Sequence, residues 1–148
     1  MNEFMKEAVS EAKTGITQGD GGPFGCVIVK NGEIVGRGHN EVVRLNDPTA
    51  HGEIMAIRNS CDALGTYDLS GSELYTTGEP CPMCLGAIMW ANIGKVFYGC
   101  TVADADRIGF RDEVFYNRQR KDFFECIDRS QCLELFEEYY NMKDKVIY

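Results

Sequence analysis

Three residues that commonly bind transition metals lie at the starts of two expected helices. Cys81 and Cys84 have the spacing C-x-x-C, and His51 follows a turn-forming loop. Residues three apart on a helix share one face, so both sulfurs can meet one ion. Two thiolates and one imidazole leave the fourth tetrahedral position of zinc open, which is the catalytic arrangement. We predict a zinc ion on His51, Cys81 and Cys84, one per subunit, with a bound water or hydroxide.

Glu53 follows His51 by two residues in the stretch HGEIMAI. In the first turn of a helix, both side chains can reach past the helix end toward an ion lying there. A carboxylate beside a metal-bound water can accept its proton and deliver it to a substrate. Glutamate is also common in first turns because of the helix dipole, so the prediction depends on all four residues together. On that basis Glu53 is the expected catalytic acid and base.

The elements that must position these residues alternate between helices and strands. Expected helices cover residues 4–16, about 50–64, 80–94 and about 131–142, while expected strands cover 26–30, 33–39, 72–77 and 95–100. The first two strands flank Asn31-Gly32, a strong hairpin signal. Short helices are expected up to about residue 117, and residues 123–127 are ambiguous. The order predicts an α/β fold: a three-layer α/β/α sandwich with a mixed central sheet of about five strands, in which 72–77 and 95–100 are parallel.

Length and charge limit the possible classes of protein. The 148 residues fit one domain, and a net charge of −8 argues against a long phosphate-binding surface. A charged N-terminus and the lack of a long apolar run argue against a signal peptide and a membrane span, so we expect a cytoplasmic protein with reduced thiols. His39 is interpreted as a structural or pocket-rim residue. The other cysteines are expected to be core thiols: Cys26, Cys61, Cys100, Cys126 and Cys132.

The chain carries H-x-E and P-C-x-x-C, the signature of the zinc-dependent base deaminases. It also contains GGPFGCVIV, NDPTAHGE, LYTTGEPCPMCLGAIMWA, KVFYG and GFRDEVFY. With these motifs it resembles the cytidine deaminase superfamily over nearly its whole length, and within that superfamily the bacterial guanine deaminases. The resemblance implies a cytidine-deaminase-like fold and zinc-dependent hydrolysis of guanine to xanthine and ammonia.

Further residues are assigned only through this resemblance. Phe24 and Trp90 match aromatic positions of the base pocket, and Asn40 matches an asparagine that hydrogen-bonds the base. Asp112 matches an acidic residue that assists proton transfer, and Tyr148 matches a C-terminal tyrosine that closes the site of a partner subunit. The implied assembly is therefore a homodimer. Whether the segment of about residues 131–148 is swapped between subunits stays open.

Three other functions remain open at this point. Cytosine deaminases of fungi share His-Gly-Glu, with Gly52 in place of the commoner alanine, and the stretch LYTT. The tRNA adenosine deaminases share the stretch NDPTA, although the acidic last helix, CLELFEEYYNMKDK, would repel a phosphate backbone. A non-enzymatic, zinc-stabilised scaffold would need a fourth protein ligand, and the sequence offers only three obvious ones.

Overall fold

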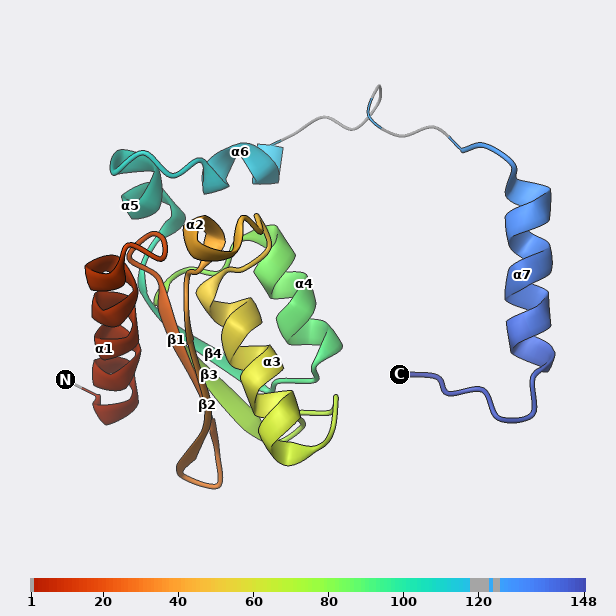
Figure 1. The fold of residues 1–148 in the computed structure, drawn as a ribbon, viewed down its shortest axis with the longest axis horizontal. Coiled ribbons are helices and arrows are strands. Elements are labelled where there is room, and N and C mark those ends of the chain that lie inside the picture. Colours follow the sequence, from red (N-terminus) through yellow and green to blue (C-terminus); the bar gives the residue numbers. More distant parts are fainter. Residues whose placement is uncertain (1, 118–122, 124–125) are drawn as a thin grey trace. The chain divides into compact units, whose positions relative to one another are not determined.

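The structure is a computed structural model that describes residues 2–117, 123 and 126–148 (Figure 1). The chain divides into two compact units, residues 1–116 and 117–148. The boundary falls ahead of the C-terminal helix, inside the chain that the sequence predicts to be one domain. Within the described residues, no helix is long and apolar enough to cross a membrane.

The first unit is built on a mixed sheet of four strands. The strands are β1 (Gly25–Lys30), β2 (Glu33–His39), β3 (Ser72–Gly78) and β4 (Lys95–Cys100), in the order β2-β1-β3-β4. Strand β1 is antiparallel to both of its neighbours, and β3 and β4 are parallel as predicted. The expectation of about five strands is wrong for the described residues. After β4 the described chain forms helices and loops, so no further strand extends the edge.

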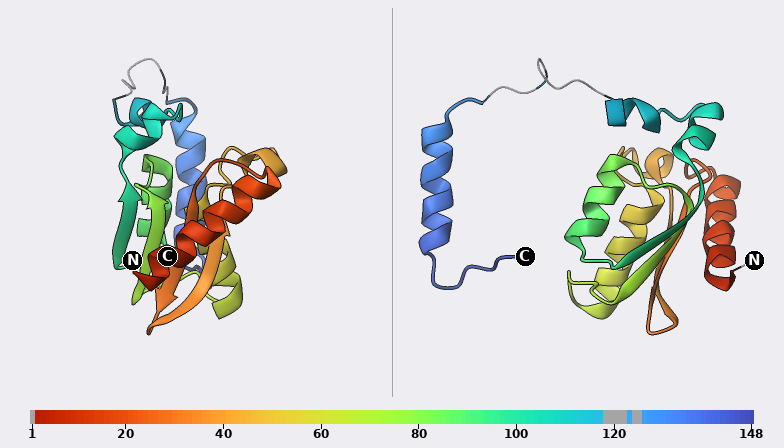
Figure 2. Two further views of the ribbon diagram at one scale, coloured as in Figure 1. Left: turned by 90° about the vertical axis from the view of Figure 1, so that its left-hand side faces the viewer. Right: turned by 180° about the vertical axis from the view of Figure 1, so that it is seen from behind.

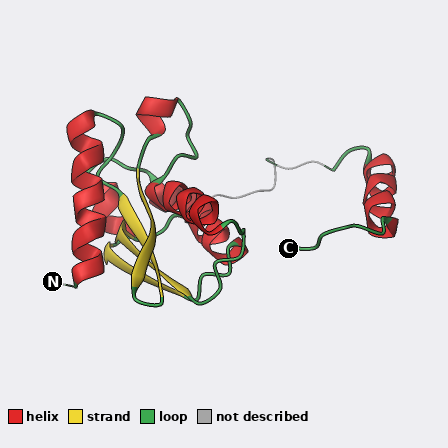
Figure 3. Ribbon diagram, turned by 60° about the horizontal axis from the view of Figure 1, so that its bottom comes forward, coloured by secondary structure: helices red, strands yellow, loops and turns green. Residues whose placement is uncertain are grey.

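Helices cover both faces of this sheet, which confirms the predicted three layers (Figures 1 and 2). Helix α1 (Glu3–Gln18) lies on one face, and α3 (Gly52–Leu64) and α4 (Pro82–Trp90) lie on the other. The alternation of side chains along β1 divides the core accordingly. Val27 and Val29 belong to the cluster that contains Phe4 of α1, whereas Cys26 and Ile28 pack with residues of α3 and α4. Figure 3 shows the same layers from a different direction.

Helix α3 buries a different face from the one its apolar residues suggested. Along the helix the sequence has the apolar residues Ile54, Met55, Ile57, Cys61 and Leu64, which predict one buried side, but the buried residues are Gly52, Glu53, Ala56 and Ser60. Small side chains allow α3 to approach β2 closely, because a Cβ atom on Gly38 would lie 2.4 Å from the Ala56 nitrogen. Only Ile57 and Cys61 of the predicted side pack partly against the core. Close packing turns the start of α3, with Glu53, toward the interior.

Helix α4 and the segments after it complete the described structure. Helix α4 ends at Trp90, four residues before the predicted closing residue Gly94, because Asn92 adopts the left-handed conformation with a φ of 60°. The backbone nitrogen of Gly94 then donates to the carbonyl oxygen of Ser72 at the start of β3. Short helices follow as predicted: α5 (Val102–Arg107) and α6 (Asp112–Asn117). Helix α7 (Arg129–Asn141) lies in the second unit, and α2 (Val42–Leu45) follows β2. Part of the ambiguous segment 123–127 lies outside the described residues.

The predicted core thiols divide into two groups. Cys26 is buried and Cys61 is half-buried, but Cys100, Cys126 and Cys132 are exposed, so the prediction is wrong for these three. Cys100 ends β4, an edge strand whose last three residues are exposed. Cys126 and Cys132 belong to the second unit, where the described residues of α7 include no buried side chain.

Candidate active site

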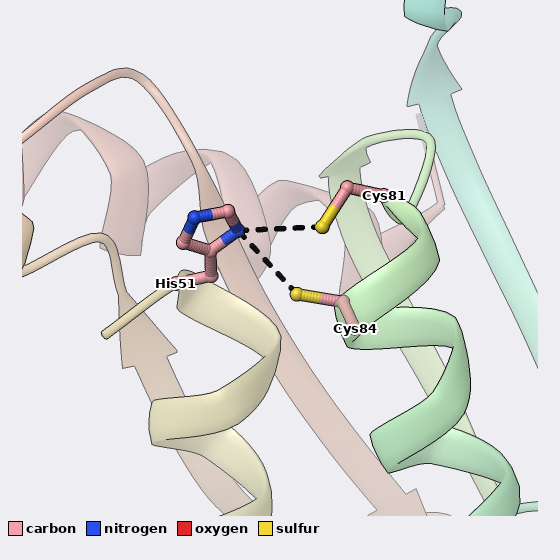
Figure 4. A group of neighbouring side chains, drawn as sticks. All are labelled: His51, Cys81 and Cys84. Atoms are coloured by element: carbon pink, nitrogen blue, oxygen red, sulfur yellow. Dashed lines mark hydrogen bonds between the residues drawn. The ribbon is translucent and has the colours of Figure 1, made fainter. Parts of the chain in front are cut away.

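The predicted metal ligands converge because α3 and α4 begin side by side at one end of the sheet. His51 is the N-cap of α3, and Cys81 is the N-cap of α4 with Pro82 at the first helical position. Nδ1 of His51 lies 3.6 Å from Sγ of Cys81 and 3.5 Å from Sγ of Cys84 (Figure 4). Zinc bonds of about 2.0–2.3 Å place tetrahedral nitrogen and sulfur ligands about 3.5 Å apart. The three side chains therefore fit a zinc ion.

The two thiols have opposite tendencies to ionise. A hydrogen bond from Cys84 lowers the pKa of Cys81 to about 4, with a further contribution from His51. The same bond, together with burial, raises the pKa of Cys84. The hydrogen bond to Cys81 also raises the pKa of His51, although burial opposes it. The lowered pKa of Cys81 favours its thiolate, which is the form that binds a metal.

Glu53 lies in the first turn of α3 and is only 6% exposed. Burial raises the pKa of its carboxyl group, as does the charge of Cys81. A carboxyl group whose pKa is raised toward neutrality is suited to both accepting and releasing a proton. The helix places this group in the same cavity as His51 and Cys81. The structure thus brings Glu53 to the metal centre as the sequence indicated.

A cavity of about 400 Å³ opens beside these residues, which is large enough for a small ligand. Three residues assigned through the family resemblance line it: Phe24, Asn40 and Asp112. The Asn40 carbonyl Oδ1 accepts a bond from the backbone nitrogen of Val42, at 3.2 Å. Burial raises the pKa of the Asp112 carboxyl group, and the charge of Cys81 raises it further.

Trp90, which was also assigned through the resemblance, does not line this cavity. Trp90 ends α4, whereas Cys81 begins it, and Trp90 is 69% exposed. At about 1.5 Å per residue, Trp90 lies about 13 Å along the helix from Cys81 and about 9 Å from Cys84. Tyr148 is the last residue of the second unit and is 78% exposed.

The cavity is also lined by residues for which the sequence predicted no role, among them Glu79, Phe110 and Phe115. Phe110 meets Phe24 edge to face, with ring centroids 4.8 Å apart and planes at 83°. Phe115 follows Asp112 by three residues, so a helix at this point places both on one side. The spacing of Phe110, Asp112 and Phe115 within GFRDEVF is the sequence pattern that could have predicted this part of the cavity.

The other histidine belongs to a second cluster, which does not include the cavity-lining residues. The His39 ring nitrogens lie 2.9 Å from Asp20 and 3.3 Å from Glu11, and Glu41 is 3.9 Å away. Burial would lower the pKa of His39, but the bonds to Asp20 and Glu11 outweigh it and raise the pKa. This arrangement connects α1, the following loop and β2. It agrees with the structural role predicted for His39.

Comparison with known proteins gives consistent matches. The family described as the cytidine and deoxycytidylate deaminase zinc-binding region matches residues 1–100. Guanine deaminase of Bacillus subtilis is 44% identical over 98% of this chain and 97% of its own length. The crystal structure of a guanine deaminase from Bacillus subtilis superimposes with a TM-score of 0.93, covering 100% of this chain and 99% of the other.

A tRNA-specific adenosine deaminase of Aquifex aeolicus is 47% identical, but over only 64% of this chain and 62% of its own. A structure of guanine deaminase from Nitrosomonas europaea has a TM-score of 0.70 and 31% identity, covering 74% of this chain and 63% of the other.

Proposed function

The chain belongs to the cytidine and deoxycytidylate deaminase family, and from this premise we propose that it hydrolyses guanine to xanthine and ammonia. The observation that carries the reaction type is the convergence of His51, Cys81 and Cys84 on one point beside buried Glu53. The observation that carries the substrate is the 44% identity to Bacillus subtilis guanine deaminase along 98% of the chain. The tRNA deaminase match covers only 64% of the chain, so about a third of the protein has no counterpart in it.

The reaction adds the oxygen of a water molecule to the ring carbon that bears the amino group. His51, Cys81 and Cys84 would hold zinc, which would supply the lowering of the pKa of water that hydrolysis needs. Glu53 would accept a proton from the attacking water and pass it to a ring nitrogen, and it would then carry the second proton of that water to the departing amine. The ring carbon gains oxygen and loses nitrogen as ammonia, so the atoms balance.

The cavity residues orient the base for this attack. Phe24 and Phe110 supply apolar ring surfaces against a planar heterocycle. The Asn40 side chain, held through Oδ1, directs its amide group at a base acceptor. Asp112 faces the same cavity, and its raised pKa suits the exchange of a proton with the purine. These roles are part of the proposal.

We also propose that the enzyme acts as a cytoplasmic homodimer. Support comes from the exposed apolar side chains Met89 and Trp90 at the end of α4, which a second subunit would cover. In this assembly Trp90 contributes to an interface rather than to the cavity of its own subunit. The tail ending at Tyr148, with its preceding helix, is proposed to close the cavity of the partner. Seven free thiols are compatible with a reducing compartment.

An ammonia-release assay on a panel of substrates tests the function. The panel contains guanine, guanosine, cytosine, cytidine, adenine and a tRNA anticodon stem-loop. We expect turnover of guanine, with at most weak turnover of the other compounds. Activity restricted to cytosine or to the RNA would reassign the substrate, and a zinc-loaded protein inactive on every compound would favour a structural role for the metal. Removal of Tyr148 should slow guanine turnover if the tail closes the site.

A further inference from the structure

Helix α6 brings Asp112 and Phe115 to the cavity although the helix itself is short. It spans six residues, and helices of this length are not stable without tertiary contacts. Its place beside the metal ligands must therefore be fixed by side chains that reach other elements. Tyr116 follows Asp112 by four residues, so the two side chains lie on the same side of α6.

The hydroxyl group of Tyr116 donates a hydrogen bond to the carbonyl oxygen of Pro80, at 2.8 Å. Pro80 immediately precedes Cys81, the ligand that begins α4. The bond therefore connects the helix that carries Asp112 with the backbone that carries the metal ligand. The two residues are 36 positions apart in the chain.

The backbone before Cys81 is a suitable anchor because other bonds hold it. The Glu79 nitrogen donates to the Cys100 carbonyl, at 2.7 Å, and the Glu79 carboxylate accepts from the Val102 nitrogen, at 3.0 Å. These contacts fix Glu79 to the end of β4 and the start of α5. Tyr116 adds α6 to the same anchor point.

We propose that Tyr116 is a positioning residue whose hydroxyl group holds α6 against Pro80 and so keeps Asp112 facing the metal site. The inference rests on the proposed function for its effect on turnover, but the position of α6 is independent of that function. Burial raises the pKa of Tyr116, as do the nearby charges of Glu79 and Cys81. The phenol consequently keeps its proton at neutral pH and remains a donor.

The test is Tyr116→Phe, which removes the hydroxyl group and keeps the ring. Tyr98→Phe is the matched control, because Tyr98 is 48% exposed and Tyr116 is 47% exposed. Both variants are purified with zinc, and turnover is expressed per bound zinc. For Tyr116→Phe we expect kcat on guanine to fall about tenfold with KM within about twofold of wild type, the size expected for one lost hydrogen bond. Tyr98→Phe should retain the wild-type kcat.

Hydrogen exchange of the full-length, zinc-loaded protein provides the second measurement. Amides of residues 112–117 should exchange about tenfold faster in Tyr116→Phe, while those of α4 keep their wild-type rates. Wild-type exchange in α6 would overturn the inference. A lower zinc content or melting temperature with unchanged kcat per zinc would assign Tyr116 a merely structural role and also overturn it. If wild-type protein did not turn over guanine, the proposed function would fail, and the exchange measurement would still decide the role of Tyr116.

Discussion

The two histidines of this chain stand in clusters of similar size but different chemistry. His51 shares its cluster with Cys81 and Cys84, and His39 shares its cluster with Asp20 and Glu41. At His51, both sulfurs lie within 3.6 Å of a single ring nitrogen, beside a cavity. At His39, Nε2 lies 2.9 Å from Asp20 and 3.9 Å from Glu41, while the other ring nitrogen, Nδ1, lies 3.3 Å from Glu11 of α1, so all of its neighbours are carboxylates and they come from different parts of the chain.

This difference shows how a metal site and a structural ion-pair cluster can be told apart. Ligands of one ion surround one point, whereas a structural histidine uses both nitrogens to connect separate elements. Thiolates also favour zinc more strongly than carboxylates do. The comparison therefore predicts that substitutions in the His51 cluster abolish guanine turnover, while substitutions at His39 change the free energy of unfolding.

The largest effect is expected from removal of a metal ligand. Cys84→Ala should lose stoichiometric zinc and lower guanine turnover by roughly three orders of magnitude or more, because the remaining two ligands bind zinc too weakly to keep the site loaded. Bound zinc is measured by atomic absorption and turnover by ammonia release. Cys26→Ala is the matched control, since Cys26 is another fully buried thiol, outside the metal cluster. Equal zinc loss in both variants would contradict the assignment of Cys84.

A change at Glu53 is expected to lower activity almost as much, but without loss of the metal. Glu53→Gln keeps the shape of the side chain but removes its capacity to accept a proton. Turnover should fall about 10³-fold while zinc remains stoichiometric. The two variants, Cys84→Ala and Glu53→Gln, thereby separate metal binding from proton transfer. Glu53→Gln protein with wild-type kcat would exclude Glu53 as the proton carrier.

A smaller and pH-dependent effect is expected at His39. Because its pKa is raised in the folded protein, the imidazolium stabilises the fold below its unfolded pKa of about 6.5. This stabilisation is lost as the pH rises through the raised value. His39→Gln should lower the free energy of unfolding by about 1–3 kcal/mol at pH 6, and by less at pH 8.5. Urea unfolding at both pH values measures this difference.

The His39 variant should retain stoichiometric zinc, and zinc loss would break the distinction between the two clusters. Glu7→Gln is a matched surface control. The side chains of Glu7 and Arg37, which form an ion pair, are each more than 40% exposed. The substitution should therefore change the free energy of unfolding by less than about 1 kcal/mol.

The smallest effect is expected at Gly52, between His51 and Glu53. A Cβ atom there would lie 3.0 Å from the Phe24 carbonyl oxygen, which accepts the backbone bond of Asn40 at 2.8 Å. Gly52→Ala should therefore move these two cavity residues slightly and raise KM for guanine about two- to fivefold, with zinc unchanged. Gly86→Ala in α4 is the control, because a Cβ atom there meets nothing within 4 Å. An unchanged KM would show that the Phe24 backbone moves enough to accommodate the methyl group without changing the shape of the cavity.

Short-range patterns were sufficient for much of the fold. The hairpin around Asn31-Gly32, the parallel pair β3 and β4, and the helix starting beside Cys81 all follow from local turn chemistry and periodicity. The buried face of α3 did not, because the glycines of β2 and the small residues of α3 set how closely the two elements pack. The exposure of Cys100 likewise depends on β4 lying at the sheet edge, which no local pattern specifies.

The sequence by itself determined which residue types are available for chemistry: the spacing of His51, Cys81 and Cys84 at helix starts predicted a zinc site, with Glu53 beside it. Only the tertiary structure decided which residues surround them. It brought Phe110 and Phe115 to the cavity, joined Tyr116 to Pro80, and left Trp90 at the far end of α4. The physical reason is that ligand identity depends on local chemistry, whereas a cavity is formed by contacts between segments far apart in the chain.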